Sequence, residues 1–253
     1  MSDVVEEGFD EGQAWLTIDG ERWAAERIIH HLGAMLADPR RARMEAVLKR
    51  RLGSVALAVE DLHHSHNGAA CVRTAEAFGV QDVLTIEGEN AFPLFDSEAD
   101  AGGVRKITKQ TQRWVSFHRQ RSSAELRAFA DARGMQLWGA APQGAATLAD
   151  VPADVPVVLI FGNELEGLRR ETQAACDGVF RIEMAGFVES FNVSVSVGIC
   201  LHTQMTRRRA IIDAPGDLPY QRQRALLARW IFEDVRAARP ILRRLRTEGV
   251  TPE

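Results

Sequence analysis

The chain has 253 residues, of which 45% are hydrophobic and 26% are charged, and its formal net charge is −4. This composition is that of an ordinary globular protein and excludes disordered, collagen-like and disulfide-scaffold proteins. The 3 cysteines form no CxxC pair and no cluster with histidine at ligand spacing, so we expect neither a disulfide framework nor a metal site. No apolar run approaches the roughly 20 residues that span a bilayer, and the acidic N-terminus differs from a signal peptide. We therefore expect a cytoplasmic protein without a membrane partner.

The charge is distributed unevenly along the chain. Residues 1–38 hold nine acidic and two basic side chains, a net charge of −7, whereas residues 40–53 carry a net +5 and residues 205–246 a net +7. Two basic flanks indicate an anionic partner, because phosphate binding normally leaves such a footprint. The alternative is that these arginines are solvated or paired with acids one helical turn away, and charge alone does not decide between the two.

Hydrophobic periodicity predicts alternating helices and strands. In chain order these are a helix at 21–37, a basic helix at 41–52, a strand at 55–60, a helix at 69–78 closed by Gly79, a strand at 82–87, a helix at 125–134, strands at 135–141 and 156–162, a short helix at 169–175, a strand at 178–184, and helices at 192–212 and 218–245, the last interrupted at Pro240. The alternation is typical of an α/β core with a mainly parallel sheet. We place this core at 54–206, between an N-terminal helical extension at 1–53 (acidic over 1–38, basic over 40–53) and a basic C-terminal helical extension at 207–253.

The first segment whose residues could bind or act on a ligand is HNGAACVRTAEAFG, residues 66–79. Asn67 and Gly68 fall at a strand-to-helix turn, and Arg73 follows about two turns into the helix. This placement suits an anion or a ribose hydroxyl at the carboxyl edge of a parallel sheet. An asparagine cap followed by a solvated arginine is the alternative.

The second segment is FGNELEGL, residues 161–168. Its glycines allow close backbone approach to a ligand, and Asn163, Glu164 and Glu166 could accept hydrogen bonds from hydroxyl or amino groups. The segment lacks the Gly-Lys-Ser/Thr of a P-loop, which argues against a nucleoside triphosphate. A plain turn rich in glycine and asparagine is the alternative.

The third segment runs from Ile182 to His202. Gly186 breaks a strand, and Ser190, Asn192 and Ser194 cluster before an apolar helix. A helix cap needs only one such side chain, so three in five residues indicate a further role.

Together and in this order, the segments resemble the three motifs of the SpoU branch of the SPOUT RNA methyltransferases, most closely those of the TrmH-type tRNA ribose methyltransferases. The matching residues are Asn67, Arg73-Thr74 and Gly79-Val80 in the first motif, Gly162, Glu164 and Gly167 in the second, and Ile182, Met184, Gly186, Ser190 and Asn192-Val193-Ser194-Val195 in the third. The flanking helices are similar as well, so the resemblance covers about residues 40–236, and residues 1–39 have no counterpart.

The resemblance implies a SPOUT-type α/β knot, in which a parallel sheet carries a C-terminal trefoil knot, with N- and C-terminal helical extensions. It also implies a homodimer with active sites at the subunit interface, and S-adenosylmethionine as the cofactor. The implied cofactor-binding residues are Ala140, Gly162, Asn163, Glu164, Gly167, Ile182, Met184 and Phe191. Two positions depart from the family pattern: His64-Ser65 replaces a basic-Pro pair, and Phe191 stands where leucine is common.

By the same resemblance, Arg73, Asn67, Ser190 and Asn192 are the catalytic residues. Arg73 would bind the phosphate beside the reacting ribose, Asn67 would orient the arginine or the ribose, and the other two would hold the nucleotide and the backbone on the cofactor side. A guanidinium stays protonated beyond pH 12, so the proton acceptor is left open, with the substrate phosphate or Glu76 as candidate relays.

The implied reaction is methylation of a ribose 2′-hydroxyl, in the TrmH-type case of the D-loop guanosine of tRNA. Ribosomal RNA as the substrate, a non-catalytic RNA-binding member, and a nucleotide-binding α/β protein outside the family are the alternatives. We expect Arg41, Lys49, Arg50, Arg51 and Arg73 to contact RNA, together with the arginine-rich C-terminal segment. Whether the acidic segment 1–39 covers part of the basic surface or extends the dimer contact is left open.

Overall fold

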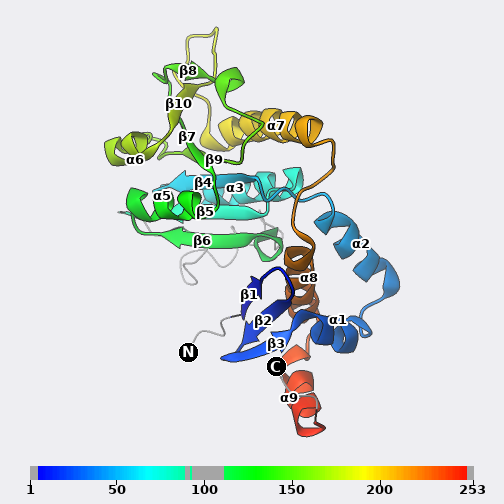
Figure 1. Cartoon of the computed structure of the whole chain (residues 1–253). Helices are drawn as coiled ribbons and strands as arrows, with labels where there is room; N and C mark the ends of the chain where they lie inside the picture. The colour runs from blue at the N-terminus through cyan, green and yellow to red at the C-terminus, as the bar shows by residue number, and fades with distance from the viewer. Residues whose placement is uncertain (1–4, 89–91, 93–110, 250–253) are drawn as a thin grey trace. The chain divides into compact units, whose positions relative to one another are not determined.

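The computed structural model describes residues 5–88, 92 and 111–249 (Figure 1). Backbone contacts divide the chain into a larger unit, Leu52–Pro215, and a smaller unit made of Met1–Arg51 and Gly216–Glu253. The sequence placed its boundaries at 53 and 206, close to the first division and nine residues before the second. The two terminal extensions, which we predicted as separate segments, therefore form one unit.

The larger unit is built on a sheet of seven strands in the order β6-β5-β4-β9-β7-β10-β8. The strands are β4 (Val55–Glu60), β5 (Asp82–Ile86), β6 (Ser116–Gln120), β7 (Gln136–Ala140), β8 (Ala146–Thr147), β9 (Val157–Phe161) and β10 (Gly178–Arg181). The helices are α3 (Ser65–Phe78), α5 (Ser123–Asp131), α6 (Arg170–Ala175) and α7 (Val193–Ile212), with short 3-10 turns η1 (Thr111–Trp114) and η2 (Leu148–Asp150). Each neighbouring pair of strands in this sheet runs parallel, which confirms the predicted α/β class.

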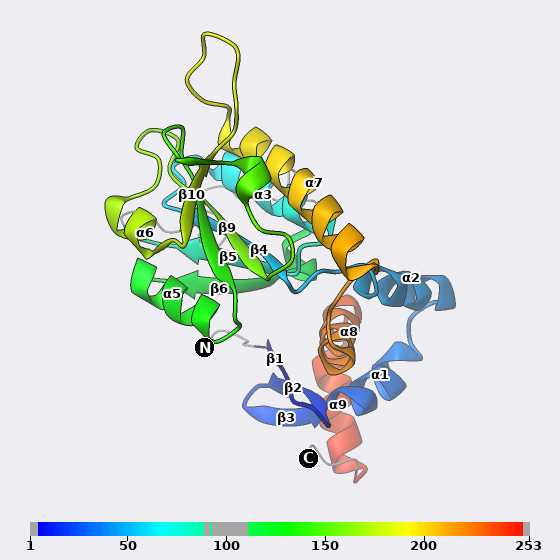
Figure 2. The same ribbon diagram turned by 45° about the horizontal axis from the view of Figure 1, so that its top comes forward.

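Both faces of the sheet are covered, which explains the unbroken apolar runs in its central strands. In β4 the side chains of Leu57 and Val59 pack with α3 and α7, whereas Ala56 and Ala58 point to the other face and pack with α5 and with the residues that flank α6, Leu168 and Cys176. Figure 2 shows α3 and α7 along one side of the strands and α5 and α6 along the other. All six residues of β4 are buried, the aliphatic ones in these two apolar layers.

The strand order places a switch point between β4 and β9. From β4 the chain adds β5 and β6 in one direction, and then crosses over to add β7 and β9 on the other side. In open parallel sheets, ligands bind outside the carboxyl ends of the strands at such a point. The first two sequence motifs follow β4 and β9 directly, so the topology brings them to the same edge.

Local signals account for the helix ends of the larger unit. Gly79 ends α3 in the left-handed conformation at φ 90°, as glycine at this position favours. Ser122 accepts a hydrogen bond from the Glu125 N–H at the start of α5, at 3.3 Å. Asn192 does the same for α7. These predicted elements are confirmed, whereas the trefoil knot that the resemblance implies stays a prediction.

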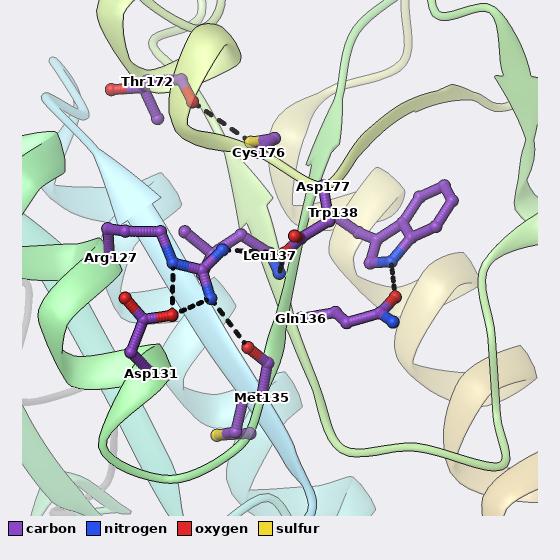
Figure 3. Close-up of polar contacts among 9 residues, drawn as sticks. All are labelled: Arg127, Asp131, Met135, Gln136, Leu137, Trp138, Thr172, Cys176 and Asp177. Carbon is purple, nitrogen blue, oxygen red and sulfur yellow. Dashed lines mark hydrogen bonds and ion pairs between the residues drawn. The ribbon is translucent and has the colours of Figure 1, made fainter.

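At the amino end of β7, an arginine joins three segments (Figure 3). The Arg127 guanidinium donates to Asp131 at 2.9 Å, to Asp177 at 2.8 Å and to the carbonyl of Met135 at 3.1 Å. Asp177 also accepts from the Leu137 N–H at 2.7 Å. The network fixes α5 and the turn before β10 to β7, at the edge of the sheet opposite the switch point.

The smaller unit contains β1 (Val5–Phe9), β2 (Ala14–Ile18), β3 (Glu21–Ala24), α1 (Ala25–Gly33), α2 (Asp38–Leu48), α8 (Tyr220–Asp234) and α9 (Ala238–Thr247). The three strands form an antiparallel sheet, and β1, β2 and α1 pack against α8. Alternate residues of β2 are buried, namely Ala14, Leu16 and Ile18, because this face of the sheet packs against α8.

The N-terminal helical extension predicted at 1–53 therefore contains a three-stranded sheet as well as helices. The predicted helix at 21–37 begins only at Ala25, and Pro39 lies in the first turn of α2, where proline is tolerated, instead of ending the preceding helix. Pro240 likewise lies in the first turn of α9, so the break between the C-terminal helices falls at 235–237. Among the described residues, no helix is long and apolar enough to cross a membrane.

Candidate active site

The side chain of Asn67 joins the three motifs at the carboxyl edge of the sheet. Its Nδ2 donates a hydrogen bond to Glu164 Oε1 at 2.6 Å, and its Oδ1 accepts one from Asn192 Nδ2 at 3.1 Å. Asn67 lies in the first turn of α3, Glu164 in the turn after β9, and Asn192 at the start of α7. Segments about 100 and 125 residues away in the sequence thus meet at one amide group.

Glu164 is an ionised acceptor at this junction. Its Oε2 accepts a second hydrogen bond, from the backbone N–H of His63 at 3.1 Å. Burial by itself raises the pKa of the Glu164 carboxyl, but the hydrogen bonds from Asn67 and from the His63 and His64 backbone outweigh it, so that the pKa lies below its ordinary value. The carboxylate is therefore charged at neutral pH and oriented by groups of the first motif.

The turn that carries Glu164 exposes backbone at the end of β9. Asn163 and Gly167 exchange two backbone hydrogen bonds, at 2.9 and 3.1 Å, and Gly167 has φ 70°. A Cβ on Gly162 would lie 2.2 Å from the carbonyl carbon of Gly167, so only glycine fits there. The Asn163 side chain closes the turn by accepting from the Leu165 N–H at 2.8 Å. The two glycines of the predicted motif are thus required by the turn's geometry.

Asn192 links the junction to the apolar helix that follows. Its Oδ1 accepts from the Ser194 N–H at 2.9 Å and from the Ser194 hydroxyl at 2.6 Å, which leaves its Nδ2 for Asn67. Val193 and Val197 anchor the first turns of α7 in the core. The third motif therefore caps a helix and contacts the first motif with the same side chain.

A buried charge network beneath the junction was missed in the sequence. Glu60, only 1% exposed, accepts from the Arg169 backbone N–H at 2.9 Å and from the Thr172 hydroxyl. The Arg169 guanidinium lies 3.3 Å from Glu60 and 2.6 Å from Asp61. Asp61 in turn accepts from the Gly88 N–H at 2.7 Å through its side chain and from Asn163 at 2.6 Å through its carbonyl. The network fixes the ends of β4, β5 and β9 to one another.

Asp61 has the left-handed conformation, with φ 45°, which is uncommon outside glycine, asparagine and aspartate. The contacts to all its polar groups hold it there. Charged residues that end apolar strands, such as Glu60 and Asp61, are the signal in the sequence that could have indicated this network.

The structure places the other predicted residues on the elements that meet at the junction and on segments beside them. Arg73 is exposed on α3, two turns beyond Asn67, and α3 packs along α7. Ser190 is exposed in the irregular segment before α7. Ala140 and Ile182 pack against the core, Met184 is half-buried, and Phe191 is 38% exposed.

Of the residues expected to contact RNA in the smaller unit, three are accessible. Lys49 and Arg50 are exposed, and Arg41 is half-exposed beside Glu45. The prediction that Arg51 contacts RNA is wrong, because its side chain is 0% exposed and its guanidinium lies 5.6 Å from the ring centre of Trp230.

The thiols supply no nucleophile. Cys71, Cys176 and Cys200 are free, and burial raises the pKa of each to about 12, so they stay protonated at neutral pH. No group of three potential metal ligands occurs within residues 5–88, 92 and 111–249.

Fold and site together define a parallel α/β protein with a ligand site at its switch point. The model of the SpoU rRNA Methylase family matches residues 54–202. The chain is 31% identical over 197 residues to the tRNA (guanosine(18)-2′-O)-methyltransferase of Thermus thermophilus, covering 77% of this chain and 96% of that protein. It is 33% identical over 166 residues to the 23S rRNA (guanosine-2′-O-)-methyltransferase RlmB of Pseudomonas aeruginosa, covering 65% of this chain and 64% of that protein. The crystal structure of the TrmH/SpoU tRNA modifying enzyme of A. aeolicus aligns with a TM-score of 0.67 at 26% identity, covering 78% of this chain and 98% of that one.

The chain belongs to the SpoU methylase family, as its three motifs predicted. The SpoU methyltransferase AviRb of Streptomyces viridochromogenes, which aligns at 21% identity with a TM-score of 0.55, has been solved in complex with the cofactor AdoMet, and the residues of this chain fit such a molecule. A Cβ on Gly139 would lie 2.8 Å from Leu168 Cδ1, so the end of β7 packs closely against the residue that follows the glycine turn. Peptide groups and apolar side chains such as Ile182 and Met184 suit an adenosyl group, which has hydrogen-bonding edges, an apolar face and no phosphate.

We predict that Glu164→Gln loosens the junction. An amide has only one acceptor oxygen for the two donors that Glu164 now binds, so the free energy of unfolding at pH 7 should fall by about 1 kcal/mol, a value reduced for partial exposure. The matched control Glu166→Gln, exposed in the same turn, should change nothing. Urea unfolding followed by circular dichroism measures both.

The same pair of variants tests the lowered pKa. A depressed pKa stabilises the fold fully above the unfolded-state value of 4.5, and this contribution is lost as the pH falls through the lowered folded-state pKa. The difference between the wild type and Glu164→Gln should therefore shrink as the pH falls below 4.5. An undiminished difference in acid would contradict an ionised Glu164.

Proposed function

We propose that this methylase transfers the methyl group of S-adenosylmethionine to a ribose 2′-hydroxyl of RNA, and that its substrate is the D-loop guanosine of tRNA. The observation that supports this most is the junction at Asn67, which gathers the three motifs of the family at the edge of the sheet next to Arg73. Positioning two reactants in line supplies most of the barrier reduction that such a transfer needs.

The residues of this chain would divide the work as follows. Gly162, Gly167 and the end of β7 would hold the cofactor, which supplies an electrophilic methyl group on a sulfonium. Ser190 and Asn192 would hold the nucleotide. Arg73 would bind the substrate phosphate and stabilise the oxygen as it loses its proton, because its guanidinium stays charged beyond pH 12. The proton passes to the substrate phosphate or to Glu76, which is on the same helix as Arg73.

Coverage of the relatives favours tRNA over ribosomal RNA. The chain spans 96% of the Thermus tRNA enzyme but only 64% of the Pseudomonas ribosomal RNA enzyme. The exposed Lys49 and Arg50 next to the larger unit in the sequence are suited to phosphate contacts. The free thiols fit the reducing cytoplasm, where such RNA lies.

We also infer a homodimer. Large apolar side chains are exposed around the site, including Leu165 at 82%, Phe187 at 109%, Val188 at 64% and Val195 at 47%. Exposed apolar residues grouped in this way mark an interaction surface. A second copy of the chain would cover them and place both subunits' residues at each site.

We predict that Arg73→Ala abolishes methylation of bulk tRNA while the variant still binds S-adenosylmethionine. Loss of one charged group at the reacting oxygen costs about 10²–10³ in rate. Transfer of a labelled methyl group measures the rate, and titration calorimetry measures cofactor affinity. The control is Arg133→Ala, at the opposite edge of the sheet, where the guanidinium lies over Phe129. Retained activity in Arg73→Ala would contradict the proposed role.

We predict that Val195→Asp separates the dimer and removes activity, because a charge in an apolar interface loses its solvation. Sedimentation velocity should give twice the chain mass for the wild type and the single mass for the variant. Ile211→Asp, also exposed on α7 but about 24 Å along the helix, should leave the dimer intact. A fully active wild-type monomer would contradict the dimer.

A further inference from the structure

The turn between β2 and β3 carries two carboxylates on a conformation that needs particular residues. Asp19 and Gly20 both have positive φ, 52° and 84°, as in the two-residue hairpin turns favoured by Asp-Gly and Asn-Gly. Glu21 follows directly as the first residue of β3. The turn thus holds two acidic side chains together at one end of the small sheet.

These carboxylates face arginines of α9. Asp19 lies 3.3 Å from Arg239 and 3.6 Å from Arg243, and Glu21 contacts Arg246. Residues 239, 243 and 246 have the spacing of one helix face and span about 10 Å along the axis. One row of guanidinium groups therefore meets the acidic turn within the smaller unit.

The exposure of these pairs shows that they are weak. The side chains of Arg243 and Arg246 are 77% and 58% exposed, and Asp19 and Glu21 are 37% and 34% exposed. Arg239 is only 27% exposed, and its guanidinium lies 5.4 Å from the ring centre of Phe232. Exposed ion pairs contribute only about 0–1 kcal/mol. The pair between Arg229 and Glu7 in the same unit differs, because its side chains are only 11% and 14% exposed and its partners are 2.7 Å apart. The pairs of Arg243 and Arg246 can open at little cost, whereas the Arg229 pair is structural.

We propose that Arg239, Arg243 and Arg246 form a binding surface for the phosphates of RNA, and that Asp19 and Glu21 are its counterions in the RNA-free protein. A row of about 10 Å is long enough to reach more than one phosphate of an RNA strand. Phosphate oxygens replace the carboxylates, and the acidic turn thereby sets the threshold for RNA binding. The inference rests on the proposed function, since it takes RNA as the partner.

The exchange has a measurable signature in salt dependence. The wild type must open these ion pairs before its arginines bind phosphate, and screening weakens the pairs as the salt concentration rises. Removing the carboxylates should therefore raise the affinity most at low salt, so that log affinity falls more steeply with log salt than in the wild type.

The experiment compares the full-length wild type with Asp19→Asn/Glu21→Gln. Asn-Gly also favours this turn, so the double variant should fold as the wild type does. Binding of a tRNA transcript, measured by filter retention between 50 and 300 mM salt, should strengthen about three- to tenfold at low salt, since two or three weak pairs no longer compete. This gain should shrink as the salt concentration rises, because screening weakens the pairs that the variant lacks.

The control Glu6→Gln/Glu11→Gln removes two exposed carboxylates of the same region that form no ion pair within residues 5–88, 92 and 111–249. It should change affinity less than twofold and leave the slope as it is. Arg243→Ala/Arg246→Ala should weaken binding much more in the Asp19→Asn/Glu21→Gln background than alone, because only freed arginines contact phosphate fully.

The inference is overturned if the two carboxylate variants bind RNA with equal affinity and equal salt slope. It is also overturned if the effects of the arginine and carboxylate changes on affinity are additive. In either case, methylation of RNA by the wild type leaves the proposed function standing. Failure of the wild type to bind or methylate RNA would overturn both.

Discussion

The site depends on one side-chain amide. Asn67 donates to Glu164 and accepts from Asn192, so both of its polar groups are used to bring three distant segments of the chain together. The bond to Glu164 is charge-assisted, which makes it the stronger of the two. Without it, the glycine turn and the start of α7 would each keep their own hydrogen bonds but would no longer be joined to each other through Asn67.

The amide works because the strand ends beneath it are fixed. Glu60 is buried with its charge, which is stable only because Arg169 and Thr172 satisfy its oxygens. Arg169 also holds Asp61, whose carbonyl accepts from the glycine turn through Asn163. The sheet and this network therefore form the fixed part of the site. The exposed residues Arg73 and Ser190 are on elements that this part holds in place.

The sequence predicted the larger unit well, since buried parallel strands such as β4 and β9 are unmistakable apolar runs and Gly79, Ser122 and Asn192 are local helix signals. It could not show that Asn67, Glu164 and Asn192 touch, because that contact depends on strand order. In the smaller unit, the predicted helix at 21–37 concealed the Asp19-Gly20 hairpin, for which the alternating apolar residues at 14, 16 and 18 were the better guide. The burial of Arg51 was equally hidden, because it follows from packing on α8.

The net charge of −4 is compatible with an RNA partner because three acids of the N-terminal sheet and its turn, Glu7, Asp19 and Glu21, are counterions to arginines of the same unit. We propose that the three motifs joined at Asn67 carry out 2′-O-methylation of tRNA. Mapping of 2′-O-methyl groups in total RNA from a strain lacking the protein tests it most directly. The account predicts loss of methylation at the D-loop guanosine of tRNA with ribosomal RNA unchanged. Unchanged tRNA, or a mark lost from ribosomal RNA instead, would contradict it.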